Sequence, residues 1–277
     1  MRQKDNYLPF VFIFIICIIV ISSVNHFGQE EQMSTSINRN QADTSGVDWF
    51  VPKTDKNQRP VFPNYVDSYI EKYNAYVIGS EEKELYLSFN CGYEFNNYTL
   101  DVLDILKEQN VKAVFFITGD YLRSSTDIVK RMKEEGHIVG NHGNTHADLS
   151  TLLSEEIKKE LVDFELCYKQ VMGVDYTDKF FRPASGRFTE ESLKIATELN
   201  YTTVFWSLSY KDWETDNQPG KEIAYEKIMR SVHPGCILML HTVSQSNVEA
   251  LGDAISDLKG QGYTFKSLEG FSQANDL

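Results

Sequence analysis

Short apolar runs alternate with longer amphipathic stretches along the chain from residue 85 onward. The short runs are typical of buried strands, whereas in the longer stretches apolar residues recur at the spacing of an α-helix. Strand, helix and strand in this order predict parallel strands joined by crossover helices. The predicted strands are Leu85–Phe89, Ala113–Ile117, His137–Val139, Lys179–Phe181, Thr202–Trp206, Cys236–Leu240 and Tyr263–Phe265. The predicted helices are Leu100–Glu108, Ile128–Glu135, Glu155–Met172, Glu190–Leu199 and Asn247–Lys259.

Polar residues follow most of the predicted strands, close to the point where each strand ends. They are Asn90 and Cys91, His142 and His146, Arg182, Asp212 and Trp213, and His241. In a closed barrel of parallel strands all the carboxyl ends open onto one face, so residues far apart in sequence meet there. We therefore predict an α/β fold, a distorted seven-stranded (β/α) barrel with one active site. A doubly wound open sheet is the alternative, because periodicity alone does not separate the two.

The first residues of the chain have the pattern of a membrane-targeting segment. Arg2 and Lys4 precede Phe10–Ile21, which is apolar throughout, and Leu8–Val24 reaches the lower limit for crossing a bilayer, roughly 17 residues. A cleaved signal peptide is the alternative, but no Ala-x-Ala-like site follows. We therefore expect residues 1–24 to hold a cytoplasmic tip and an uncleaved transmembrane anchor. Basic residues before the span keep the N-terminus inside, so the rest of the chain is expected outside the cytoplasm.

A polar stretch separates this segment from the folded part. Residues 25–60 are rich in Gln, Asn, Ser, Thr and Asp, and so few of them are apolar that burial cannot offset the entropy of ordering. We expect a flexible linker there and one domain over residues 61–277. Within Val61–Ile78 apolar residues recur at helical spacing, which predicts an N-terminal helical extension of the domain.

Composition excludes some partners and one kind of stabilisation. The net charge is −13 and the isoelectric point is near 4.9, whereas binding a phosphate backbone needs clustered Lys and Arg, so we expect no nucleic-acid partner. Beyond the apolar segment there are three cysteines, Cys91, Cys167 and Cys236, an odd number that implies no disulfide framework. We expect Cys167 and Cys236 to be small buried apolar side chains.

Two histidines stand four residues apart in the motif His142-Gly-Asn-Thr-His146. On one helical turn this spacing places both imidazoles on the same face, where they can bind one divalent metal ion. The zinc-protease motif requires Glu directly after the first His as general base, and this chain has Gly143 there. The sequence therefore predicts a metal site, with zinc as the expected ion, and excludes a metalloprotease of that type.

A second constellation consists of Asp212-Trp213 and His241. An imidazole at a strand end that is oriented by a carboxylate can donate a proton to a leaving amine, because the carboxylate stabilises the cationic imidazole. Taken separately, a capping Asp or a structural His would explain each residue equally well. Their predicted convergence with the His142–His146 pair favours a catalytic role.

Several segments together resemble the polysaccharide deacetylases that share the nodulation-protein-B homology domain, carbohydrate esterase family 4. The resemblance spans roughly Val61 to Ser267, and some motifs are similar to the delta-lactam-biosynthetic de-N-acetylase branch, which acts on spore-cortex peptidoglycan. The segments are Ser88-Phe89-Asn90-Cys91-Gly92-Tyr93-Glu94, Gly140-Asn141-His142-Gly143-Asn144-Thr145-His146, Phe181-Arg182-Pro183, Val204-Phe205-Trp206-Ser207, Asp212-Trp213 and Leu240-His241-Thr242-Val243-Ser244.

The resemblance implies metal-assisted hydrolysis of N-acetyl groups on amino sugars of peptidoglycan or another N-acetylated glycan, with muramic acid of spore cortex as the expected sugar. The implied roles are activation of water at position 90, orientation of that base by Arg182, and proton donation by His241 tuned by Asp212. His142 and His146 would hold the metal, backbone N–H groups near Ser185 would stabilise the oxyanion, and Trp213 would contact substrate.

The chain departs from the family pattern where the family has the base Asp. Asn90 stands at that position, and an amide does not accept a proton from water near neutral pH as a carboxylate does. Cys91 follows, either as a third metal ligand or as an inert buried thiol. Two hypotheses remain: a deacetylase with reduced activity or a substitute base such as Glu94, and a glycan-binding or regulatory homologue with weak or no turnover.

Overall fold

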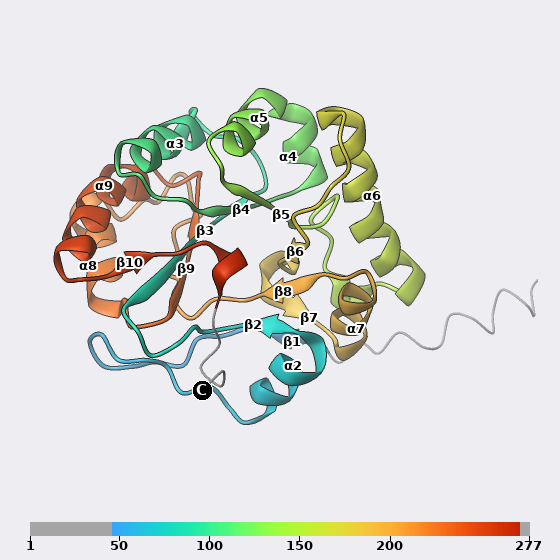
Figure 1. Ribbon diagram of the computed structural model, residues 1–277, viewed down its shortest axis with the longest axis horizontal. Helices are drawn as coiled ribbons and strands as arrows, with labels where there is room; N and C mark the ends of the chain where they lie inside the picture. Colours follow the sequence, from blue (N-terminus) through green and yellow to red (C-terminus); the bar gives the residue numbers. More distant parts are fainter. Residues whose placement is uncertain (1–45, 272–277) are drawn as a thin grey trace, which may run out of the picture. The chain divides into compact units, whose positions relative to one another are not determined.

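Eight mostly short strands form one parallel sheet that curves around a central axis and is covered by helices on its outside (Figure 1). The structure is a computed structural model and describes residues 46–271. The strand order in the sheet is β10-β3-β4-β5-β6-β8-β2, and the eighth strand, β9, lies off this path and also pairs with β3. Its strands are β2 (Ala75–Tyr76), β3 (Glu84–Cys91), β4 (Val114–Ile117), β5 (Ile138–Asn141), β6 (Phe180–Phe181), β8 (Thr202–Val204), β9 (Cys236–His241) and β10 (Thr264–Phe265).

The sheet curves far enough for its two sides to meet. After β8 the chain runs alongside β9, where Leu208 and Leu238 form a parallel bridge and the Met239 amide donates to the Leu208 carbonyl over 2.9 Å. This contact favours a distorted barrel over a doubly wound open sheet. Because all the strands of this sheet pair in parallel, their carboxyl ends lie on one face, as predicted.

The number of strands differs from the prediction. Every predicted strand is present, but the sheet has an eighth, β2, inside the region Val61–Ile78 that we expected to be helical. The helix there, α2 (Tyr65–Tyr73), ends because Asn74 adopts a left-handed conformation with φ of 47°. Ala75 then pairs with Thr203 of β8 and is fully buried. Two residues are too few to produce a recognisable strand pattern.

Helices cover the outside of the sheet. The predicted ones appear as α3 (Tyr98–Glu108), α5 (Thr126–Glu134), α6 (Ser154–Met172), α7 (Glu190–Glu198) and α9 (Gln245–Gly260). Two were missed, α4 (Gly119–Ser124) and α8 (Lys221–Ser231). Only Ala224 and Ile228 of α8 are buried, so its apolar periodicity is weak.

Alternation along the strands separates two apolar layers. Leu85, Leu87 and Phe89 of β3 belong to the large core between the sheet and the helices, whereas Tyr86 belongs to a smaller cluster inside the barrel. Since side chains of a strand alternate between faces, Asn90 follows Tyr86 and points inward, toward the barrel axis. The inward face of β3 therefore brings Asn90 to the carboxyl end of the barrel.

Part of the predicted linker is folded. Residues 25–45 lie outside the described residues, but β1 (Val47–Asp48) pairs antiparallel with β7 (Arg187–Phe188). The Trp49 indole donates to the Trp206 carbonyl over 2.9 Å, and its ring stacks on Phe205 with centroids 4.3 Å apart. For residues 46–60 the expectation of a flexible linker is wrong, because this aromatic contact anchors an otherwise polar stretch to the domain.

The predicted membrane anchor, residues 1–24, lies outside the described part of the chain. Within residues 46–271, no helix is both long enough and apolar enough to span a bilayer.

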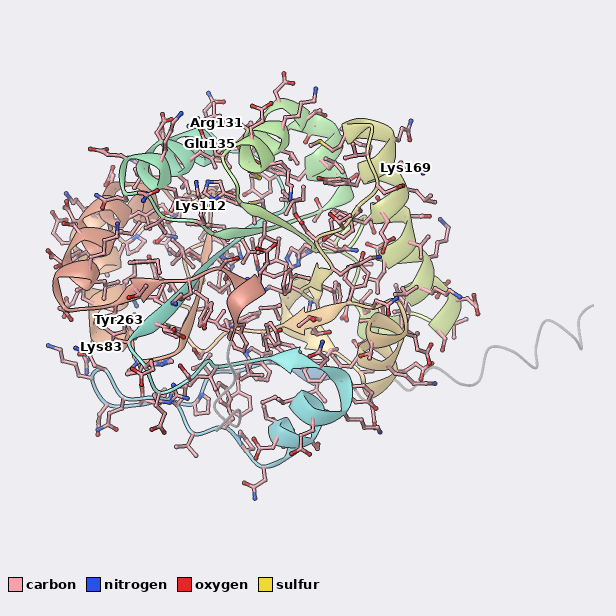
Figure 2. The ribbon with its side chains drawn as sticks, in the orientation of Figure 1. Lys83, Lys112, Arg131, Glu135, Lys169 and Tyr263 are labelled. Carbon is pink, nitrogen blue, oxygen red and sulfur yellow. The ribbon has the colours of Figure 1, made fainter. Side chains whose placement is uncertain are left out.

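A buried histidine, His137, precedes β5 in the large core. Its Nδ1 accepts the Ala113 amide N–H over 3.2 Å, so the proton of the neutral ring is on Nε2, which lies 4.0 Å from Glu135. Glu135 is itself paired with Arg131 over 3.0 Å, and the Lys112 ammonium binds the Glu135 carbonyl nearby (Figure 2). Burial, reinforced by the positive charge of Lys112, lowers the pKa of His137 to about 4.

We predict that His137 makes the protein less stable as the pH falls from about 6.5, the ordinary His value, toward 4. In this window the unfolded chain binds a proton that the folded chain excludes, so stability falls with decreasing pH. His137→Asn keeps an acceptor for the Ala113 amide and should flatten the dependence of the free energy of unfolding on pH, by at most about 1.4 kcal/mol per pH unit. Urea titrations at several pH values measure this slope, and equal slopes in both proteins would contradict the prediction.

Candidate active site

A pocket of about 780 Å³ opens at the carboxyl end of the barrel. Its wall contains side chains that follow strands β3, β5, β6, β8 and β9, so the predicted convergence on one face is present. Six of the residues singled out from the sequence line it: Asn90, His142, His146, Ser185, Trp213 and His241. Two others, Arg182 and Asp212, are buried behind the wall, and each hydrogen-bonds to a residue that lines the pocket.

Arg182 holds Asn90 in place. The Arg182 guanidinium is fully buried and donates to Asn90 Oδ1 over 3.0 Å. Its other donors bind the carbonyls of Val204 and Phe205, at 2.9 and 3.1 Å. Because no carboxylate is among these partners, burial lowers the pKa of Arg182 well below its usual value. The site therefore contains a buried cation whose hydrogen-bond acceptors are all uncharged.

His241 lies directly beside Asn90. The two are paired residues in the parallel register of β3 and β9. Asp212 Oδ1 accepts a hydrogen bond from His241 Nδ1 over 2.7 Å, and Asp212 Oδ2 accepts from the His241 amide over 2.8 Å. Asn247, at the start of α9, donates to the same carboxylate over 2.6 Å. Since Nδ1 faces Asp212, the Nε2 atom of His241 is the one available to a ligand in the pocket.

His142 and His146 face each other, with ring centroids 4.8 Å apart. His142 Nδ1 lies 2.7 Å from the Arg182 carbonyl, which can only accept, so Nδ1 carries the proton and Nε2 has a free lone pair. Burial lowers the pKa of both rings, that of His142 to well below its ordinary value, and the nearby His241 lowers the pKa of both further. Neutral imidazoles with a fixed tautomer are suited to metal binding.

The local conformation of the histidine motif differs from the prediction. We expected one helical turn, but the segment after β5 is a loop in which Gly143 and His146 have φ of 85° and 61°. A side chain at position 143 would also meet the Glu160 carboxylate, 2.9 Å from the Cβ position. The rings meet because the loop folds back, and not because of helical spacing.

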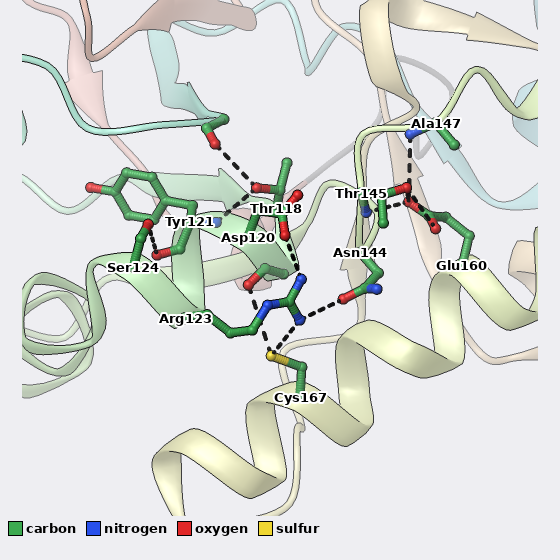
Figure 3. Close-up of polar contacts among 12 residues, drawn as sticks. Thr118, Asp120, Tyr121, Arg123, Ser124, Asn144, Thr145, Ala147, Glu160 and Cys167 are labelled. Carbon is green, nitrogen blue, oxygen red and sulfur yellow. Dashed lines mark hydrogen bonds and ion pairs between the residues drawn. The ribbon is translucent and has the colours of Figure 1, made fainter.

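Helices α4 and α6 hold this loop from outside the pocket (Figure 3). Glu160 of α6 accepts hydrogen bonds from the Thr145 amide over 2.5 Å and from the Thr145 hydroxyl over 3.0 Å. Arg123 of α4 donates to Asn144 Oδ1 over 3.0 Å. Glu160 was not singled out in the sequence, because a Glu within a helical pattern is indistinguishable from a solvated one.

Cys91 is not placed with the histidines. It belongs to the core cluster between the sheet and the helices, on the face of β3 opposite to Asn90, and it does not line the pocket. Burial raises the pKa of its thiol to about 12, which disfavours the thiolate that would bind a metal. Within residues 46–271 no group of three or more His, Cys, Asp or Glu side chains is arranged to hold a metal ion. Alternation along β3 therefore supports the inert thiol among the two alternatives for Cys91.

Two carboxylates could serve as a substitute base, Glu94 and Asp120, and both have hydrogen-bond or ion-pair partners. Glu94, the expected substitute base, accepts from the Tyr121 hydroxyl over 2.8 Å and from the Thr99 amide over 3.3 Å, and it does not line the pocket. Asp120 does line the pocket, and is paired with Arg123 over 2.6 Å. Asp120 was missed because the helix that carries it was missed.

Comparison with known proteins agrees with this fold. Residues 78–204 match the polysaccharide deacetylase family, and close relatives cover most of the chain. The chain belongs to this family, whose members are hydrolases of carbohydrate esterase family 4.

One relative is the peptidoglycan-N-acetylmuramic acid deacetylase PdaA of Bacillus subtilis, 44% identical over 80% of this chain and 84% of its own length. The solved structure of PdaA, a family 4 carbohydrate esterase, matches with a TM-score of 0.78 at 42% identity, covering 82% of this chain and 97% of that one. A family 4 pseudoenzyme from Bacillus anthracis matches with a TM-score of 0.63 at 31% identity, covering 69% and 65%. A mutant of that pseudoenzyme has restored enzymatic activity.

Proposed function

We propose that this chain binds N-acetylated peptidoglycan in the pocket and hydrolyses its N-acetyl groups slowly, because the general base of the reaction is missing. The observation that carries the proposal is the pairing of Asn90 with His241 across β3 and β9, with Arg182 bound to Asn90. The acid side of the site is present, and the residue opposite to it is an amide. Hydrolysis of an acetamide needs a base to take a proton from water and an acid to protonate the leaving amine.

The proposed acid is His241. Its Nδ1 is held by the buried Asp212 carboxylate, which stabilises the cationic ring and leaves Nε2 to donate a proton to the amine as the C–N bond breaks. Trp213 lies against His241, with ring centroids 5.4 Å apart, and would contact the sugar beside it. Backbone N–H groups near Ser185, which lines the pocket, would stabilise the oxyanion.

His142 and His146 would hold a divalent metal, with zinc as the expected ion. Their neutral rings and the hydrogen bond that fixes His142 Nδ1 fit this role, although they supply only two ligands. A bound metal would polarise the acetamide carbonyl.

Asn90 accounts for the proposed low rate. Its Oδ1 is occupied by Arg182, and its amide nitrogen is a donor, so it cannot take a proton from water. Removing a positioned general base typically lowers a rate by about 10²–10⁴-fold.

A second candidate function is glycan binding or regulation without turnover. The same amide at position 90 favours it, together with the similarity to a pseudoenzyme of the same esterase family. Binding needs the pocket and its aromatic wall but no base, so the two candidates differ only in turnover.

The sugar we propose is muramic acid, in spore cortex, because the relative PdaA is a peptidoglycan-N-acetylmuramic acid deacetylase. The similarity to the delta-lactam-biosynthetic branch points the same way.

We predict that the purified protein binds about one divalent ion and that His142→Ala or His146→Ala removes it. The physical reason is the loss of one of two facing imidazole ligands. Cys91→Ser is the matched control and should retain the ion, because Cys91 belongs to the outer core. Elemental analysis after dialysis measures the content. The same amount of metal in wild type and in both histidine variants would contradict the site.

We also propose that the protein is anchored in the membrane by Leu8–Val24, with the catalytic domain outside the cytoplasm, because no cleavage site follows the apolar run. Mass analysis of the mature protein should then find these residues in the membrane fraction, whereas an N-terminus after Val24 would indicate cleavage and secretion.

We predict that Asn90→Asp raises deacetylation by at least about tenfold, the low side of what a positioned base contributes. The Arg182 guanidinium lies 3.0 Å from the present Asn90 Oδ1, so the new carboxylate would lie next to it. The positive charge favours the ionised form of the carboxylate, which in turn gives the buried cation a counterion. Acetate release from N-acetylated oligosaccharides measures the rate.

The matched control for this variant is Asn90→Asp combined with His241→Ala, which should lose the gain because the amine has no proton donor. If Asn90→Asp folds, binds metal and remains at the wild-type rate, the missing-base account is wrong. Asp120→Asn and Glu94→Gln would then identify the substitute base.

A further inference from the structure

One wall of the pocket comes from a segment that precedes the family motifs in the sequence. Trp49, Phe50 and Val51 line the pocket, but they precede the matched residues 78–204 and the domain start expected at residue 61. This segment therefore adds to the binding surface a part that the family motifs do not include.

The segment is fixed rigidly to the barrel. The Trp49 amide donates to the Gly186 carbonyl over 2.9 Å, and the Trp49 indole donates to the Trp206 carbonyl over 2.9 Å. The Trp49 ring also stacks on Phe62 and Phe205, with centroids 5.2 and 4.3 Å away. With Trp49 held on both sides, the position of Phe50 at the mouth is set by its neighbour.

Phe50 is one of three aromatic side chains left half exposed around this pocket. Phe50 is 50% exposed, Tyr93 is 52% exposed and Trp213 is 48% exposed, and all three line the pocket. The fourth exposed large aromatic in the described residues, Tyr65, lies on α2 and does not line it. Exposing apolar rings costs hydration free energy, so their concentration at one mouth indicates a ligand that covers them.

The rings stand on different sides of the mouth. Trp49 is bound beside Gly186 and Trp206, so Phe50 belongs to the side of β6 and β8, whereas Tyr93 follows β3. In the sheet order β4 and β5 separate β3 from β6. Aromatic rings on separated sides suit an extended ligand that crosses the mouth better than a single small molecule inside it.

The wall of the pocket carries little formal charge. Among the described residues that line the pocket there is no Lys or Arg, and Asp120 is the one carboxylate. Pyranose rings have apolar C–H faces that pack on aromatic rings and hydroxyl edges that remain in water, so a chain of N-acetylated sugars fits this wall.

We propose that Phe50 forms a separate binding position for a sugar ring next to the one that carries the reacting acetyl group, so that the protein prefers a glycan chain to a single sugar. The proposal rests on the proposed function in taking an N-acetylated glycan as the occupant. Phe50 would position the glycan by contact with a neighbouring sugar ring, and it would not contact the reacting atoms.

The test is direct binding of N-acetylglucosamine and of its β-1,4-linked tetrasaccharide to the full chain, followed by tryptophan fluorescence, since Trp49, Trp206 and Trp213 line the pocket. Phe50→Ala should weaken binding of the tetrasaccharide by about tenfold, in line with the loss of one aromatic contact and its buried area. Binding of the monosaccharide should not change. Phe50→Tyr should keep the wild-type affinities, because the ring face remains.

Tyr65→Ala is the matched control, because Tyr65 is an aromatic of similar exposure away from the pocket. Equal affinities of Phe50→Ala and Tyr65→Ala for the tetrasaccharide, or an equal loss of affinity for both sugars in Phe50→Ala, would overturn the proposal.

Because binding needs no hydrolysis, the result is independent of turnover. Weakened tetrasaccharide binding in Phe50→Ala supports the Phe50 position even if no variant releases acetate, whereas acetate release with unchanged tetrasaccharide binding overturns Phe50 and leaves the proposed function standing.

Discussion

The arrangement of the pocket depends on one buried guanidinium. Arg182 donates to Asn90 on β3 and to the carbonyls of Val204 and Phe205 at the end of β8. Its backbone amide donates to the Asn141 carbonyl on β5, and its own carbonyl accepts from His142. A single residue after β6 therefore fixes the ends of three strands, β3, β5 and β8. Burying a charge without an ionic partner is costly, and the Phe116 ring, whose centroid is 4.1 Å from the guanidinium carbon, offsets part of this cost.

This constraint explains how a folded site accommodates an amide at position 90, and under the proposed function the same amide accounts for the altered chemistry. An amide satisfies the hydrogen bond from Arg182 as a carboxylate would, so the strand ends keep their places. It does not supply the negative charge or the proton acceptor. The Asp212–His241 pair and the His142–His146 pair are held by other contacts, which do not involve Asn90. Similarity both to a muramic acid deacetylase and to a pseudoenzyme of the same esterase family is consistent with such a site.

Much of this could be predicted from the sequence, because strand ends in a parallel barrel meet by geometry. The apolar runs located every long strand, and the residues following them, apart from Cys91, line or support the pocket. Features that rest on few residues were missed: β2 has two residues, and α8 buries only two side chains.

Other features depend on contacts that a linear pattern does not contain. Residues 46–60 look like a linker until Trp49 is seen against Phe205. Cys91 and Asn90 are adjacent in sequence but point to opposite faces of β3. Alternation predicts this opposition, but it does not say which of the two side chains points to the pocket until the inward face of β3 is known. The histidine motif has helical spacing, yet the positive φ of Gly143 makes it a loop.

The central claim is that the wild-type chain keeps the pocket of a deacetylase without its base. The most direct measurement is the rate at which wild-type protein, in excess over peptidoglycan fragments that it binds, removes acetyl groups as followed by mass spectrometry. The account predicts that the protein binds the fragments. It also predicts that acetyl groups are lost about 10²–10⁴-fold more slowly than the roughly 10 s⁻¹ of a typical enzyme. Acetyl loss by the wild-type chain at that typical rate would contradict it.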